Sequence, residues 1–155
     1  LSSNEKRTNM IIEKAIAENK DSKNKIIIFA GSLDSANHID KILKMEGIIC
    51  ALVTGETNLI ERRNNIELFK QEKSNMNIII NYGVLTTGFD APKVNVVMIS
   101  RPTHSIVLYS QMIGRGLRGP AIGGSDSCKI IDVRDNIQGY SDDEGIFDYF
   151  QEYFN

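Results

Sequence analysis

Cysteine and histidine are scarce in this chain, which holds two of each among 155 residues. Cys50 and Cys128 lie far apart inside apolar runs, with no Cys-x-x-Cys pair and no cluster of histidines nearby. That pattern argues against a structural zinc site and predicts two buried, reduced thiols. His38 and His104 are isolated, and we expect His38 on the partly exposed side of a helix. The sequence therefore predicts no metal ligands.

Long apolar runs and an initial methionine are also missing. No stretch approaches the roughly 18 apolar residues of a membrane span, and no signal peptide is visible, so we expect a cytoplasmic protein without membrane contact. The composition, 41% hydrophobic and 25% charged, excludes disordered and solenoid classes. A length of 155 residues predicts a single domain over residues 1–155. Because the chain opens on Leu1, we expect a fragment of a longer protein.

No strong excess of charge of one sign is present, because 18 lysines and arginines face 20 aspartates and glutamates, for a net charge of −2. That balance argues against a protein that coats nucleic acid by bulk attraction. The distribution is uneven, since residues 91–134 are mainly basic and residues 135–155 carry only acidic charges. We expect an acidic closing helix over 145–154 within that tail.

Apolar residues alternate between two periodicities along the chain. Spacings of three or four residues predict helices over 9–19, 34–47, 58–71, 105–117 and 145–154. Short apolar and β-branched runs predict strands over 25–30, 48–53, 76–81, 94–100 and 128–133. Strands that alternate with helices imply right-handed crossovers. The fold class predicted is therefore α/β, a three-layer parallel sheet flanked by helices.

Short polar residues mark where two of these helices begin and end. Asp34 or Ser35 can cap the second helix, and Gly47 ends it as a C-terminal cap. Asn58, followed three residues later by Glu61, resembles a capping box for the third helix. Three apolar residues of the third helix are expected on one face: Leu59, Ile66 and Phe69.

Small, hydroxyl or charged residues follow every expected strand. In parallel sheets, ligands bind at the carboxyl ends of the strands. Those ends carry Gly31-Ser32, Thr54-Gly55, residues 82–90, Arg101-Pro102 and Arg134-Asp135. Backbone N–H groups and hydroxyls at such positions suit phosphate contacts, so we expect the functional site at this edge.

The segment 110–119 is the most informative one for chemistry. Arg115 and Arg118 lie three residues apart on an expected helix, and Gln111 projects on nearly the same face. Arginine is permanently charged and binds phosphate oxygens through two parallel hydrogen bonds. Gly114 leaves room for a ligand or another backbone to approach. The pattern suits a clamp on the γ-phosphate of a nucleotide, although a basic helix end stabilised by the helix dipole looks the same.

Two further patterns allow more than one interpretation. Residues 114–119 satisfy G-x-G-x-x-G, but a dinucleotide fingerprint opens a helix after a strand and these glycines close one, so we reject dinucleotide binding. The segment 85–92 follows the third strand and suits contact with a ribose or an arginine, but it also fits a plain turn. Its polar and flexible residues are Thr86, Thr87, Gly88 and Asp90.

The order of four segments is more specific than any one of them: IIFAGS at 27–32, VTG at 53–55, TTGFDAP at 86–92 and QMIGRGLR at 111–118. This order resembles the second, RecA-like motor domain of superfamily 2 helicases and translocases over residues 8–135. The chain looks closest to the branch of DEAH-like repair helicases and the motor subunits of type I and type III restriction enzymes. The resemblance implies a RecA-like fold and ATP-dependent work on nucleic acid.

The resemblance also implies roles for single residues. Arg115 and Arg118 match the arginine fingers that reach the γ-phosphate of ATP, and Gln111 matches the glutamine that opens their motif. The implied ATP contacts are Gly88, Asp90 and Gly114. The implied nucleic-acid contacts are Ser32, Thr54, Gly55, Thr86, Thr87 and a basic position at Arg62 or Arg63.

Two positions depart from the wider family pattern. Gln111-Met112 stands where many DEAD-box members have His-Arg, and Tyr82 stands where many members have a threonine. We therefore expect a chain outside the typical DEAD-box RNA group. Its expected partner is nucleic acid, with DNA favoured over RNA, although contacts to the sugar–phosphate backbone do not decide between the two. Thr86 or Thr87 could supply the hydroxyl that Tyr82 lacks.

The chain also lacks G-x-x-x-x-G-K-[ST] and a strand that ends in D-E-x-[D/H]. The phosphate-binding loop and the Mg²⁺ carboxylates must then come from an N-terminal motor domain of the same protein, with ATP between the two domains. We expect this chain to be inactive by itself. The alternative is a stand-alone, non-catalytic nucleotide- or protein-binding module of doubly wound fold, because the chain offers no catalytic base or metal ligand.

Overall fold

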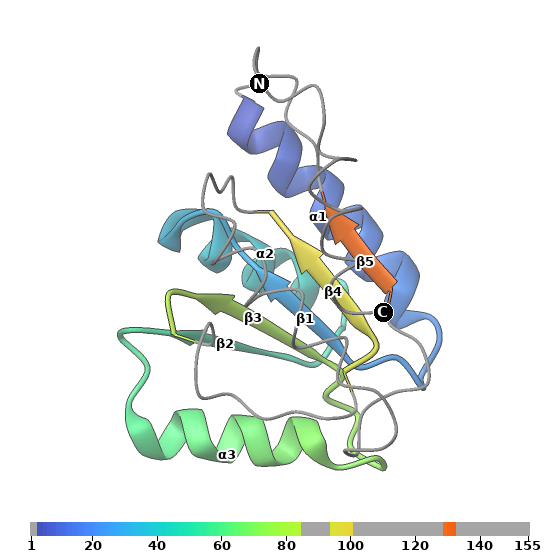
Figure 1. The fold of residues 1–155 in the computed structure, drawn as a ribbon, viewed down its shortest axis with the longest axis vertical. Helices are drawn as coiled ribbons and strands as arrows, with labels where there is room; N and C mark the ends of the chain where they lie inside the picture. The colour runs from blue at the N-terminus through green and yellow to red at the C-terminus, as the bar shows by residue number, and fades with distance from the viewer. Residues whose placement is uncertain (1–2, 85–93, 101–128, 133–155) are drawn as a thin grey trace, which may run out of the picture.

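The computed structural model describes residues 3–84, 94–100 and 129–132, which form a sheet covered by helices (Figure 1). The helices are α1 (Ser3–Asn19), α2 (Leu33–Met45) and α3 (Leu59–Lys70). The strands are β1 (Ile26–Phe29), β2 (Cys50–Thr54), β3 (Ile78–Tyr82), β4 (Val96–Ile99) and β5 (Lys129–Asp132). None of the described helices is long and apolar enough to cross a membrane. The helices expected at 105–117 and 145–154 lie outside the described residues.

The five strands pair in the order β2-β3-β1-β4-β5, and every pair is parallel. The central strand β1 is buried along its whole length, as is β4. Burial on both faces explains why these strands read as continuous apolar runs rather than as alternating ones. All five strands therefore occur where the sequence predicted them, and the parallel sheet is confirmed.

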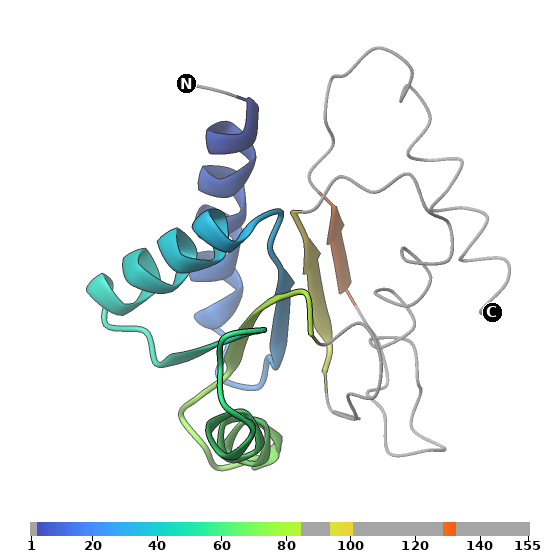
Figure 2. The ribbon, with the colours of Figure 1, turned by 90° about the vertical axis from the view of Figure 1, so that its left-hand side faces the viewer.

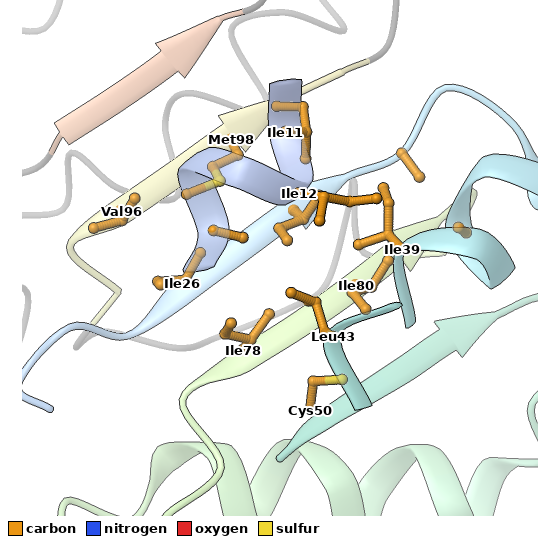
Figure 3. Packing of buried hydrophobic residues seen from close by; sticks show 14 residues of the cluster. Ile11, Ile12, Ile26, Ile39, Leu43, Cys50, Ile78, Ile80, Val96 and Met98 are labelled. Carbon is orange, nitrogen blue, oxygen red and sulfur yellow. The ribbon is translucent and has the colours of Figure 1, made fainter. Parts of the chain in front are cut away.

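Successive side chains of the strands enter two different cores. Ile26 and Ile28 point into a cluster with residues of α1 and α2 (Figure 3). Ile27 and Phe29 belong to a second cluster, which includes Phe69 of α3. Because neighbouring side chains of a strand leave opposite faces, α3 covers the other face of the sheet from α1 and α2 (Figure 2). The predicted three-layer arrangement is confirmed.

The start of α2 corrects the expected cap. Ser32, and not Asp34 or Ser35, is the N-cap, because Ser32 has an extended backbone (φ −157°, ψ 166°) and its side chain accepts a hydrogen bond from the Ser35 N–H. Ser35 instead completes the capping box from inside the helix, and Asp34 lies in the first turn. The first helix also begins earlier than expected, at Ser3 rather than at residue 9.

The face of α3 is also only partly as expected. Asn58 is the N-cap and its side chain accepts from the Glu61 N–H at 2.8 Å, which confirms the predicted start. Phe69 is buried and Ile66 partly buried, but Leu59 is 71% exposed. The three residues share one face by their spacing, but that face is not covered as far as Leu59, because a periodic pattern identifies a face of the helix and not how far the covering layer extends along it.

Cys50 is a free, buried thiol on the edge strand β2, as the sequence predicted. Burial, together with the neighbouring Asp40 carboxylate, raises the pKa of the Cys50 thiol to about 12. The thiol stays protonated and weakly nucleophilic at neutral pH. His38 is exposed on α2, as expected, whereas Cys128 and His104 lie outside the described residues.

Gly47 ends α2 in the left-handed region, with φ of 78°. Its N–H donates to the Lys44 carbonyl at 3.0 Å, and the next N–H, of Ile48, donates to the Leu43 carbonyl at 3.0 Å. These two bonds form the Schellman motif and satisfy carbonyls that the helix leaves without partners. The predicted C-terminal cap is therefore confirmed.

We expect Gly47→Ala to lower the free energy of unfolding by about 1–2 kcal/mol, because a Cβ in the left-handed region clashes with the backbone. Urea denaturation followed by circular dichroism measures the change. Gly55→Ala is the matched control, since Gly55 has no positive φ and an added Cβ would meet no atom within 4 Å. Equal losses in the two variants would contradict the conformational explanation.

Candidate functional site

The described strands end together at one edge of the sheet. The register sets Phe29 beside Asn81, and Thr54 beside Tyr82. Past the end of β4, the Ser100 N–H still donates to the Phe29 carbonyl, at 2.9 Å. The segments that follow β1, β2, β3 and β4 therefore begin at the same edge, as the sequence predicted for the site.

Ser32 lies at this edge, just past β1, and is partly exposed. Its Oγ accepts from the Ser35 N–H at 3.0 Å, while the Ser35 hydroxyl donates to the Ser32 carbonyl at 3.0 Å. A hydroxyl that accepts one hydrogen bond keeps its proton for another acceptor. The N-terminus of α2 also presents backbone N–H groups there, although Asp34 adds a negative charge to the first turn. Ser32 can thus cap the helix and still donate to a phosphate oxygen.

Thr54 and Gly55 form a tight turn after β2, two strand positions from β1 in the sheet and so about 10 Å away. Thr54 is 4% exposed, and its Oγ1 accepts from the Glu56 N–H at 3.2 Å. The Thr54 N–H donates to the Thr57 hydroxyl oxygen at 3.0 Å, and the Thr57 N–H donates to the Thr54 carbonyl at 3.2 Å. Thr54 therefore shapes the turn from within, and Gly55 and Glu56 are the exposed residues of the turn.

Gly55 is not required by the fold itself. Its φ is not positive, and the space where a Cβ would lie is open to 4 Å. A glycine in such a place allows another molecule to approach the backbone closely. This open backbone suits the predicted contact with a sugar–phosphate chain.

Arg62 lies in the first half of α3, which begins where β2 ends (Figure 1). The side chain is partly buried, and its Nε is buried with no hydrogen-bond partner among the residues that the structure describes. A buried N–H without an acceptor costs free energy, and only an acceptor that bound this N–H would remove that cost. Arg63, the other candidate at this position, is exposed. Of the two, Arg62 is the one that the domain holds in place.

Asn81 shapes the end of β3 and was missed by the sequence reasoning. It is 1% exposed, and its Oδ1 accepts from the Val84 N–H at 3.3 Å. Between them, Gly83 adopts a φ of 83°, so the chain turns sharply just before the segment 85–92. The available signal was an amide at the end of a run of isoleucines, where a buried polar group requires a partner.

The structure thus brings Ser32, Thr54 and Gly55 to one edge and places Arg62 on the helix that follows. The other predicted site residues lie outside the described residues: Thr86, Thr87, Gly88, Asp90, Gln111, Gly114, Arg115 and Arg118. Within residues 3–84, 94–100 and 129–132, no group of three or more histidine, cysteine, aspartate or glutamate side chains could hold a metal ion.

The chain is similar in sequence to known helicases. The model of the helicase conserved C-terminal domain matches residues 7–119, which include β1 to β4. IRC3 of Saccharomyces cerevisiae, a protein named as an ATP-dependent helicase, is 35% identical over 131 residues. That match covers 83% of this chain but 18% of the relative, so the chain spans about a fifth of IRC3.

Solved structures share the fold. Dbp5 of S. cerevisiae bound to RNA and ADP BeF3 superposes with a TM-score of 0.68 at 24% identity, over 98% of this chain and 37% of Dbp5. A fragment of an HsdR subunit of a type I restriction enzyme from Vibrio vulnificus YJ016 gives 0.65 at 24% identity, over 81% and 26%. The RecA-like fold is confirmed, as is the predicted likeness to restriction-enzyme motor subunits at the level of fold. The chain belongs to the helicase conserved C-terminal domain family.

Proposed function

We propose that this chain is the second motor domain of an ATP-dependent nucleic-acid helicase or translocase. The observation that carries the proposal is the shared edge of Ser32 and the Thr54-Gly55 turn, with Arg62 on the helix that follows, in a chain of the helicase C-terminal family. The edge offers a hydroxyl, an open backbone and a cation, which are the groups that hold a sugar–phosphate chain.

The nucleotide side of the proposal rests on sequence. Arg115 and Arg118 act as arginine fingers on the γ-phosphate of ATP, with Gln111 beside them in the motif. Gly88, Asp90 and Gly114 also contact ATP. ATP and Mg²⁺ are held mainly by an N-terminal motor domain of the same protein, because this sequence lacks the phosphate-binding loop. This chain by itself would then bind ATP weakly and not hydrolyse it.

The nucleic-acid side divides into contacts of different kinds. The Ser32 hydroxyl and the Gly55 backbone contact the sugar–phosphate chain and fix its path, and Arg62 supplies charge. Thr86 and Thr87 add hydroxyls beyond β3. Contacts to the backbone of the strand carry no base information, so they serve a motor that moves along any sequence. We propose DNA as the partner, because Gln111-Met112 departs from the pattern of typical DEAD-box RNA proteins.

The experiment is nucleic-acid-stimulated ATP hydrolysis by the full-length protein, with single-stranded DNA, duplex DNA and RNA compared in parallel. We expect Arg62→Ala to raise the concentration needed for half-maximal stimulation about 10- to 100-fold, since a hydrogen bond to a charged group contributes roughly 1.5–3 kcal/mol. The slope of the logarithm of the binding constant against the logarithm of the salt concentration should decrease in magnitude by about one, as expected for the loss of one phosphate contact.

Lys41→Ala provides the control for loss of a positive charge, because Lys41 is exposed on α2 and away from the turn after β2. It should change neither the affinity nor the salt slope. If nucleic acid stimulates Arg62→Ala and the parent protein equally, and the salt slope is the same for both, then Arg62 does not contact the nucleic acid. A protein that no nucleic acid stimulates would overturn the motor assignment as a whole.

A further inference from the structure

Lys25 is a buried lysine with an unusual set of partners. It lies just before β1 and is 5% exposed. Its Nζ donates to the Gln71 carbonyl at 3.0 Å and to the Met76 carbonyl at 3.3 Å, and lies 5.5 Å from the centre of the Phe69 ring. Burial lowers the pKa of Lys25 from its ordinary value, because removal from water disfavours the charged form of the amine. A lysine that faced solvent would avoid the cost of desolvation. The contacts of the buried Lys25 ammonium therefore point to a structural role.

The contacts hold the C-terminal end of α3. Gln71 is the C-cap of that helix, and Phe69 is its one fully buried residue among the described residues. By comparison, α2 buries four of its residues. Of the other large apolar side chains of α3, Ile66 is partly buried against the same core, whereas Leu59, Ile60 and Leu68 are 71%, 74% and 43% exposed. The attachment of α3 to the sheet is thus concentrated where Lys25 meets it.

The same face of α3 carries Arg62. Arg62, Ile66 and Phe69 are spaced by four and three residues and so lie along one side of the helix. Arg62 is seven residues from Phe69, about 10 Å along the axis at 1.5 Å per residue. A helix of 12 residues moves as a rigid element, so a shift at Phe69 and Gln71 is carried to Arg62.

We propose that Lys25 is a positioning residue for Arg62, which it places by fixing the C-terminal end of α3 against the sheet. This inference rests on the proposed contact between Arg62 and nucleic acid. Lys25 lies at the amino end of β1, the opposite end of the sheet from Ser32 and Gly55. It therefore does not contact the nucleic acid itself. It acts through α3 alone.

The test is a double-mutant cycle in the full-length protein, read as the nucleic-acid concentration for half-maximal stimulation of ATP hydrolysis. Lys25→Met keeps the aliphatic stem over Phe69 and removes the donors. We expect this variant to raise that concentration about three- to tenfold, with an unchanged rate at saturating nucleic acid. In an Arg62→Ala background the same substitution should have no further effect.

Two control variants separate positioning from stability. Lys25→Arg keeps a cation with several donors and should recover most of the affinity. Lys44→Met removes an exposed lysine that pairs with Asp40 on α2, and should leave the affinity unchanged. Amide hydrogen exchange provides an independent readout, since Lys25→Met should accelerate exchange along α3, including the turn that holds Arg62, and not along α2.

Each outcome decides between the two proposals. Weaker binding in Arg62→Ala but not in Lys25→Met would overturn the positioning role and leave the proposed function intact. If the effects of Lys25→Met and Arg62→Ala on the free energy of binding are additive in the double mutant, the positioning role is also overturned, because Lys25 then acts independently of Arg62. If Arg62→Ala has no effect, the proposed contact fails and the positioning role fails with it.

Discussion

Replacement of Arg115 or Arg118 by alanine in the full-length protein is expected to reduce the nucleic-acid-stimulated rate of ATP hydrolysis by about 10³- to 10⁵-fold. An arginine finger meets negative charge that grows on the transferred phosphoryl group in the transition state, so its loss lowers kcat more than it weakens ATP binding. Single-turnover hydrolysis with saturating single-stranded DNA measures the rate directly. Binding of a fluorescent ATP analogue should change much less.

A charge-retaining variant sharpens this prediction. Arg115→Lys keeps the positive charge but loses the planar pair of donors, so we expect a rate between those of the parent and Arg115→Ala. Lys41→Ala on α2 controls for a general loss of positive charge. Full stimulated activity in both Arg115→Ala and Arg118→Ala would contradict their role as arginine fingers. If ATP affinity and the rate of hydrolysis fall by the same factor, the arginines contribute to binding of ATP in the ground state instead.

Phe69→Ala is expected to lower the free energy of unfolding by about 3–5 kcal/mol, the usual cost of removing a buried aromatic ring. Phe69 is 1% exposed and is the one described residue of α3 buried in the core that contains Ile27 and Phe29, with Ile66 packed more loosely against it. The substitution also removes the ring above which the Lys25 ammonium lies. Urea denaturation of the chain, followed by circular dichroism, measures the change.

The neighbouring residue gives the matched control. Leu68 precedes Phe69 on the same helix but is 43% exposed, so Leu68→Ala should cost well under the value for Phe69→Ala. If Leu68→Ala and Phe69→Ala lower the free energy of unfolding by similar amounts, Phe69 does not anchor α3. The contacts at the C-terminal end of the helix would then contribute little to stability.

The strands could be predicted because the central strands are buried on both faces. Continuous runs such as Ile26–Phe29 have no polar face to confuse with a loop or an amphipathic helix. The cap of α2 could not be chosen from sequence alone, since Ser32, Asp34 and Ser35 can all accept a backbone N–H. The choice depends on which of them has the extended backbone, and the structure gives that to Ser32.

The described part of the site was predictable because it depends on topology. Parallel strands end at one edge, so Ser32 and the Thr54-Gly55 turn had to lie there once the strands were known. Lys25 was not predictable, since its partners lie 46 and 51 residues further along the chain. In sequence it reads as the polar start of an apolar strand. The roles of Arg115 and Arg118 remain predictions from motif order.

The strand order has a consequence for how the chain forms during synthesis. β1 and β2 are not neighbours in the sheet; each pairs with β3. A nascent chain that has not yet reached Ile78 contains two apolar strands and no native partner for either. The parallel sheet can start only when β3 has left the ribosome and can pair with either strand. Until then, α1 and α2 are the native elements that can shield β1 from aggregation.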